Sequence, residues 1–294
     1  MIFWVVLGHY TWAKHIKYEP SLIWNIMGII TLFHMLFFYT VSDILYKERN
    51  IRETIKKGWQ QLLTPYFVMS LSCIFIMSVF NMINGNFNAI ATLKIFFAIL
   101  TGGDFHYSDP YSGPLWFCYS LFLIKFFESI VSSFKYKKLI RHILIILGII
   151  VLFKGNILHL RLDSSLVGYI FILIGFSCKE KINSIICCVD NTTQKIKTVL
   201  FAIIAFMLLF FSAYLNLDFY FKPHLSINSC IFGKYPLLFI VGGLSGTWLC
   251  LVISKIVSLI FPHSKLEVKK GLLRKMVSGG WQGKKVGKCF YIYK

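Results

Sequence analysis

The sequence predicts an all-α, polytopic integral membrane helix bundle. Of its 294 residues, 57% are hydrophobic and only 15% are charged, and the mean hydropathy is +0.69. A soluble globular chain carries roughly 25% charged residues. Segments such as 200–211 are apolar all round and do not alternate with period two, which favours helices over the strands of a membrane barrel. We therefore expect helices that satisfy their own backbone hydrogen bonds within the bilayer.

Apolar segments divide the chain into about eight expected spans. The first ends near Trp12 and is short, because a span needs ~20 residues; we expect its true start to lie upstream. The clear spans are 24–45, 62–83, 115–134, 197–217 and 235–261, and two marginal spans are 140–153 and 164–178. Within the long loop 84–112, the apolar piece 90–100 is too short to span and is predicted to be re-entrant or interfacial. Small residues in the last span predict close helix packing: Gly242, Gly243, Ser245 and Gly246.

Basic residues account for the formal net charge of +19 and gather in alternate loops. The loop 46–61 carries five Lys or Arg, and the stretch from Lys265 to the end carries nine. Cytoplasmic loops of membrane proteins are enriched in Lys and Arg, so membrane topology explains this charge and no nucleic-acid partner is expected. We expect a multi-pass membrane domain over 1–262, with its basic loops in the cytoplasm, and a basic cytoplasmic tail over 263–294.

The sequence lacks the usual motifs of metal-binding and nucleotide-binding proteins. None of the eight cysteines forms a C-x-x-C pair, so neither a zinc site nor a disulfide framework is expected. Asp104, His106 and Asp109 cluster in the long loop and could form a metal or sugar site, although a solvated loop is the favoured interpretation. The chain has no P-loop, G-x-G-x-x-G, G-x-S-x-G or H-E-x-x-H motif.

His9 is the first candidate catalytic residue. It lies in the apolar run 2–10, and ionisable side chains inside a bilayer are costly, so such a residue is a site hypothesis by default. A neutral imidazole can act as a general base on a hydroxyl near neutral pH. The alternative, a histidine satisfied by a neighbouring helix, is equally supported by position alone.

The candidate binding and pocket residues each have an alternative, purely structural role, and their location in the sequence favours that role. Lys56 and Lys57 could bind the phosphates of a CoA thioester, or could simply mark a cytoplasmic loop. Trp116 and Phe117 could shape a substrate pocket, or belong to an interfacial aromatic belt. His34 could face His9 across the bundle, or serve in packing.

One polar pair is expected inside a span. Lys125 and Glu128 lie one helical turn apart in the segment 115–134, and residues at this spacing are neighbours on a helix surface. We therefore expect these two side chains to pair with each other.

Four short blocks resemble the acyltransferase-3 family of membrane O-acyltransferases, in particular its fucose 4-O-acetylase-like branch. Val5-Val6-Leu7-Gly8-His9 resembles the first helix of that family. The other blocks follow in order and spacing: Leu36-Phe37-Phe38-Tyr39-Thr40-Val41-Ser42, then Leu62-Leu63-Thr64-Pro65-Tyr66, then Gly113-Pro114-Leu115-Trp116-Phe117. Together they cover roughly the first half of the chain.

The resemblance implies a bundle of ~10 helices in a bacterial inner membrane. It implies transfer of an acetyl group, with acetyl-CoA as the donor, to a sugar hydroxyl of a surface polysaccharide or its lipid-linked precursor. The family's first-helix histidine matches His9, and the basic residues nearest to the family's basic pair are Lys56 and Lys57, which lie further upstream. His34, Ser42, Trp116 and Phe117 are the expected lining of the substrate pocket, and no metal is expected.

The chain also departs from the family pattern. Trp59, Gln60 and Gln61 stand where the family has arginines, and Asp43 stands where it prefers glycine. The resemblance also implies residues before the first helix and a closing apolar helix, so we expect a gene product that is truncated or frame-shifted at its ends. Two alternatives follow: a catalytically dead remnant, or a polytopic transporter or flippase of glycan precursors. A transporter is expected to have a broken helix pair and an internal repeat, which the sequence does not show.

Overall fold

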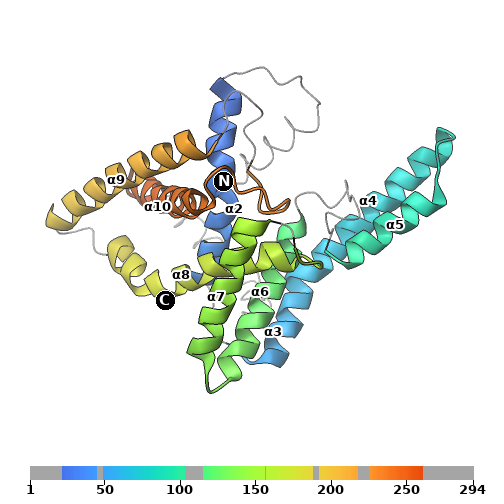
Figure 1. The fold of residues 1–294 in the computed structure, drawn as a ribbon, viewed down its shortest axis with the longest axis horizontal. Coiled ribbons are helices and arrows are strands. Elements are labelled where there is room, and N and C mark those ends of the chain that lie inside the picture. The colour runs from blue at the N-terminus through green and yellow to red at the C-terminus, as the bar shows by residue number, and fades with distance from the viewer. Residues whose placement is uncertain are drawn as a thin grey trace, which may run out of the picture. The chain divides into compact units, whose positions relative to one another are not determined.

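A computed structural model describes residues 22–44, 49–102, 115–155, 157–187, 192–217 and 225–260, and this part of the chain is helical (Figure 1). The elements are α2 (Leu22–Ile44), α3 (Ile51–Gly58), the π-helical segment η1 (Trp59–Leu63), α4 (Thr64–Ile83), α5 (Ala89–Leu100), α6 (Trp116–Ser133), α7 (Lys137–Lys154), α8 (Leu162–Cys187), α9 (Thr192–Asn216) and α10 (Pro236–Ile260). An isolated antiparallel bridge joins Ser226 and Ile231 in the loop before α10.

Five stretches of these helices are long and apolar enough to cross a membrane. They are Asn25–Ser42, Ile51–Ile83, Trp116–Ser133, Ile196–Asn216 and Pro236–Ser254. Each overlaps one of the five clear spans of the sequence, so the length and composition of the helices confirm the prediction of a multi-pass helical membrane protein. The expected first span and the tail 263–294 lie outside the described residues.

The two marginal segments and the short apolar piece are all helical. The segment 140–153 lies in α7, which also carries Lys137, Lys138 and Arg141, and so is not among the five candidate spans. The segment 164–178 lies in α8, whose apolar part covers Leu162–Gly175. The piece 90–100 is α5, at 12 residues too short to span, as expected.

The predicted loop 46–61 is wrong over most of its length, because α3, η1 and α4 form one helical rod from Ile51 to Ile83. Asn50 starts this rod as an N-cap, its side-chain oxygen accepting a hydrogen bond of 2.8 Å from the Glu53 N–H. Thr54 is buried, and Gly58 lies against Phe122 of α6, where an added Cβ would be 2.6 Å from the ring. This contact along α6 stabilises a helix whose charges suggested a solvated loop.

The π-helical segment η1 explains how the rod passes Pro65. A proline inside an α-helix lacks an N–H and clashes with the carbonyl four residues earlier. Here the backbone N–H and the hydroxyl of Thr64 both donate to the Trp59 carbonyl, the hydroxyl at 2.9 Å. The widened turn therefore carries the helix past Pro65. Single-turn π segments of this kind are frequent at functional sites.

The chain divides into two compact units, Met1–Leu249 and Cys250–Lys294. Within the first unit α8 is central, because α2, α6 and α7 all pack against it. Gly148 of α7 makes this approach close, since an added Cβ would lie 2.7 Å from the Leu166 carbonyl oxygen. The expected close packing at the small residues of α10 is confirmed: Gly242 and Gly246 lie directly against Leu32 and Phe33 of α2.

α4 and α5 form a helical hairpin, side by side in Figure 1. Gly85 turns the chain with φ +71°, and the Asn88 side chain caps α5 by accepting from the Ala91 N–H at 3.0 Å. The buried Tyr66 hydroxyl donates to the Ile99 carbonyl oxygen at 2.8 Å. The end of α5 is thereby fixed beside the start of α4, next to α6.

Candidate functional site

Three helix ends meet at one buried place in the first unit. α5 is followed by Gly102, α6 begins at Trp116, and Arg161 directly precedes α8. The Arg161 Nε donates to the Gly102 carbonyl oxygen at 2.9 Å, and its Nη1 donates to the Asn228 carbonyl oxygen at 2.8 Å. Irregular backbone in a membrane protein is tolerated where protein buries it or where it lines a cavity. We call this place, defined by Gly102, Trp116, Arg161 and Asn228, the arginine junction.

Arg161 occupies an unusual position for a charged residue. It is only 8% exposed, and its backbone adopts the left-handed region with φ 60°. Non-glycine residues seldom adopt that region, and those that do cluster at functional sites. The guanidinium carbon lies 6.0 Å from the centroid of the Trp116 ring, within the range of a cation–π interaction. The contacts with Gly102, Asn228 and Trp116 therefore hold the Arg161 side chain in one conformation.

A chain of hydroxyl groups runs beside the arginine junction, linking α2, α6 and α8. The Tyr39 hydroxyl oxygen lies 2.8 Å from Ser120 Oγ, and Ser120 Oγ lies 3.1 Å from Ser165 Oγ. Ser165 in turn donates to the Arg161 carbonyl oxygen at 2.7 Å. Because that carbonyl only accepts and each hydroxyl has one proton, the direction of donation is Tyr39 to Ser120 to Ser165. These hydroxyls therefore hold three helices together, and none is arranged as an activated nucleophile.

The expected pocket residues of α2 lie along one side of that helix. These residues, His34 and Ser42, share a helix face with Phe38, because the three follow one another at intervals of four residues. The Phe38 ring contacts the Phe117 ring, with centroids 5.9 Å apart. His34 Nδ1 lies 3.1 Å from the Ile30 carbonyl oxygen, so Nδ1 carries the proton in a neutral ring and Nε2 carries the lone pair.

Trp116 and Phe117 lie at the start of α6, as the sequence suggested, but in different surroundings from an aromatic belt. Trp116 is only 6% exposed and packs edge-on against Phe117, with ring centroids 6.2 Å apart. Phe117 also contacts the buried Tyr39 ring at 4.8 Å. Both side chains therefore pack within the protein beside the arginine junction.

Lys56 and Lys57 lie in the last turn of α3 and are exposed. They stand directly before Gly58, where the rod packs against Phe122 of α6. Their exposure suits a charged, water-soluble ligand and suits equally a role in membrane topology.

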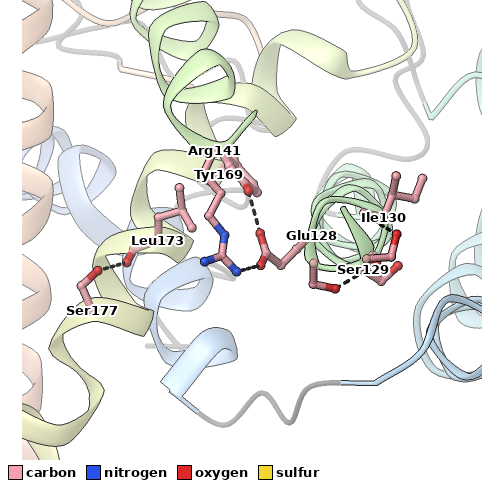
Figure 2. Close-up of polar contacts among 9 residues, drawn as sticks. Glu128, Ser129, Ile130, Arg141, Tyr169, Leu173 and Ser177 are labelled. Atoms are coloured by element: carbon pink, nitrogen blue, oxygen red, sulfur yellow. Dashed lines mark hydrogen bonds and ion pairs between the residues drawn. The ribbon is translucent and has the colours of Figure 1, made fainter. Parts of the chain in front are cut away.

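A second polar cluster joins α6, α7 and α8 (Figure 2). Glu128 forms an ion pair with Arg141 through one carboxylate oxygen, and the Tyr169 hydroxyl donates to the other at 2.6 Å. The pair expected from sequence was Lys125 with Glu128; the contacts seen here reach Glu128 from other helices. The signal available in the sequence was that Glu128 is the only acidic residue between positions 115 and 155.

Two of the candidate sites predicted from the sequence lie outside the described residues: the catalytic candidate His9, and the loop cluster Asp104, His106 and Asp109. In the part of the chain that the structure describes, no group of three or more His, Cys, Asp or Glu side chains could hold a metal ion.

Residues from the blocks that carry the family resemblance converge on the first turns of α6. Tyr39 of the second block contacts the ring of Phe117 in α6. Tyr66 of the third block contacts α6 through Tyr119, with ring centroids 5.7 Å apart. These residues are far apart in the sequence yet surround one end of one helix. Comparison with protein-family models, with curated proteins and with solved structures finds no match to this chain.

Proposed function

We propose that this protein is a membrane O-acyltransferase. It would move an acetyl or other short acyl group from acyl-CoA to a sugar hydroxyl of a cell-surface polysaccharide or its lipid-linked precursor. The observation that carries the proposal is the convergence on α6: the second and third blocks both contact the start of the helix that the fourth block opens. Such a convergence is expected if the blocks serve one site.

In the proposed reaction His9 accepts the proton of the sugar hydroxyl while the hydroxyl oxygen attacks the thioester carbonyl carbon. The carbon–sulfur bond then breaks, the sugar ester forms, and CoA leaves as the thiol after taking up a proton. The exposed Lys56 and Lys57 would bind donor phosphates through charge-assisted hydrogen bonds. His34, the other histidine among the candidate site residues, is the alternative base.

The position of the arginine junction along the rod bears on how donor and acceptor meet. Tyr66, at the level of Tyr119, lies about 22 Å from Ile51 and about 25 Å from Ile83 at 1.5 Å per residue. The charged residues of the rod lie in its first two turns, whereas the apolar stretch begins near Leu62. Tyr66 therefore lies near the end of the apolar stretch that is closer to Lys56 and Lys57, the residues proposed to bind the donor.

Acetyl-CoA binding tests the donor part of the proposal. The full chain in lipid nanodiscs should bind acetyl-CoA, and unlabelled CoA should compete for the site, because the phosphates are the expected anchor. Binding of neither ligand would contradict the assignment of a CoA-dependent enzyme.

A transporter of glycan precursors is the second candidate, and one observation favours it. Transport sites in membranes are often built where helices are discontinuous. The ends of α5, α6 and α8 at the arginine junction have this character. A transporter should move a lipid-linked glycan across vesicle membranes without acetyl-CoA, whereas the acyltransferase should leave its acceptor chemically modified.

A further inference from the structure

The turn between α6 and α7 has the character of a membrane-interface segment. We take it together with the first three residues of α7, as the segment from Phe134 to Leu139, in which every residue is exposed. Three of these residues are lysines, Lys135, Lys137 and Lys138, and two are aromatic, Phe134 and Tyr136. Aromatic rings and lysines are enriched at the level of lipid headgroups. We call this segment the basic turn.

The charge of the basic turn is not balanced by a carboxylate within its two helices. Glu128 is the only acidic residue between positions 115 and 155, and it is already paired with Arg141 (Figure 2). Lys135 stacks near the Tyr136 ring at 6.0 Å, a contact that leaves its charge in place. The backbone N–H groups at the start of α7 add partial positive charge at the same place. An anionic group at the turn would therefore meet a local excess of positive charge.

An apolar groove begins beside the basic turn. It has a volume of about 190 Å³ and is lined by Phe127, Ile130, Val131, Ile140, Leu144, Leu158, Leu162 and Leu166, from α6, α7, α8 and the loop before α8. Lys137, Ile140 and Leu144 follow the spacing i, i+3, i+7, so the lysine lies on the groove-lining face of α7. The two features therefore form one surface, charged at one end and apolar along its length.

The chemistry of the groove excludes the polar substrates considered above as its occupant. Sites for polar small molecules carry a few polar groups that fix the orientation of the ligand. The side chains that line this groove are all aliphatic or aromatic. It offers nothing to hydrogen-bond a sugar or the nucleotide of CoA, whereas a hydrocarbon chain needs no such partner.

We propose that the basic turn and this groove bind an anionic phospholipid of the surrounding membrane. Its phosphate headgroup would lie against Lys135, Lys137 and Lys138, and one acyl chain would occupy the groove past Ile140 and Leu144. Basic clusters beside transmembrane helices attract anionic lipids in this way. The bound lipid would fill the groove between α6, α7 and α8, next to the Glu128–Arg141 pair.

Native mass spectrometry of the full chain, titrated with dioleoyl phosphatidylglycerol or dioleoyl phosphatidylcholine, tests the headgroup. Phosphatidylglycerol should bind better by about tenfold or more, since several lysines contribute. The triple variant K135Q/K137Q/K138Q should lose this preference. The matched control R52Q/K56Q/K57Q removes the same charge from α3, which does not line the groove, and should keep the preference.

A second pair of variants tests the acyl chain. Leu144→Trp fills the groove and should reduce phosphatidylglycerol occupancy. Leu147→Trp makes the same change at an exposed position of α7 outside the groove lining and should not. Gel filtration confirms that each variant is folded. Equal binding of the two lipids, equal loss in both triple variants, or equal occupancy in both tryptophan variants would overturn the proposal.

Discussion

The Tyr39 hydroxyl of α2 lies 2.8 Å from Ser120 Oγ of α6, joining residues 81 positions apart in the sequence. Ser165 of α8 extends the contact, and its own proton goes to the Arg161 carbonyl. The bonds place α2, α6 and α8 in register beside the arginine junction.

The direction of this hydroxyl chain predicts unequal effects of deleting its two ends. Tyr39→Phe removes only a donor, and Ser120 can still donate to Ser165, so a loss of about 0.5–1 kcal/mol is expected. Ser165→Ala removes the acceptor of the Ser120 proton and leaves a buried donor unsatisfied, so a loss of about 1–3 kcal/mol is expected. The free energy of unfolding in mixed SDS–detergent micelles measures both. A larger loss for Tyr39→Phe would mean that the donation runs the other way.

Close packing of α10 on α2 predicts that Gly246→Ala destabilises the protein by about 1–3 kcal/mol. The new methyl group would lie 2.2 Å from Phe33 Cγ and 2.6 Å from Phe33 Cβ, so a change of side-chain rotamer cannot relieve the clash fully. The control is Ser254→Ala, an exposed position on the same helix that should be neutral. The same micelle assay compares them, and a neutral Gly246→Ala would show that the two helices are farther apart than described.

The Glu128–Arg141 pair predicts strong coupling between two substitutions. The side chains are 13% and 18% exposed, so removing one partner strands a charge in a largely apolar setting. In a double-mutant cycle, Glu128→Gln and Arg141→Met should show a coupling energy of about 1–3 kcal/mol. Lys125→Met with Glu128→Gln is the comparison cycle, because these two residues were the pair expected from sequence. A larger coupling to Lys125 than to Arg141 would contradict the contacts seen here.

How far the sequence predicts the fold differs between its apolar and its charged segments. Hydropathy alone placed the five candidate spans, because a lipid-facing helix such as 196–216 is apolar on every side. It missed α3, because Arg52, Lys56 and Lys57 looked like loop charges. The overlooked signal was Asn50 followed three residues later by Glu53, a spacing typical of a helix start.

The candidate site was predictable only in part, since its contacts join distant residues. Trp116 and Phe117 were recognised as pocket candidates from their block, but nothing local to position 161 indicated that its arginine would meet Gly102 and Trp116. Likewise Tyr169 could be matched with Glu128 only once α6 and α8 were packed together. Periodicity gives the face of a helix, and tertiary packing decides which faces meet.

The proposed donor site predicts a kinetic effect of removing two exposed charges. K56Q/K57Q should raise the KM for acetyl-CoA by about tenfold and leave kcat near the wild-type value, because the lysines would bind the ground state and the transition state alike. K137Q/K138Q removes the same charge from the basic turn and serves as the control. Equal kinetics for K56Q/K57Q and wild type would contradict the assignment of these lysines to the donor-binding site.

The O-acetyl content of surface polysaccharide from cells lacking this gene decides whether the protein is an acyltransferase. The cells would be complemented with the wild-type chain, His9→Ala or His34→Ala, with protein levels matched in the membrane. We predict that acetylation is lost in the deletion, returns with wild type and with His34→Ala, and stays absent with His9→Ala. Rescue by His9→Ala but not by His34→Ala would move the base to α2. Unchanged acetylation in the deletion strain would contradict the acyltransferase assignment.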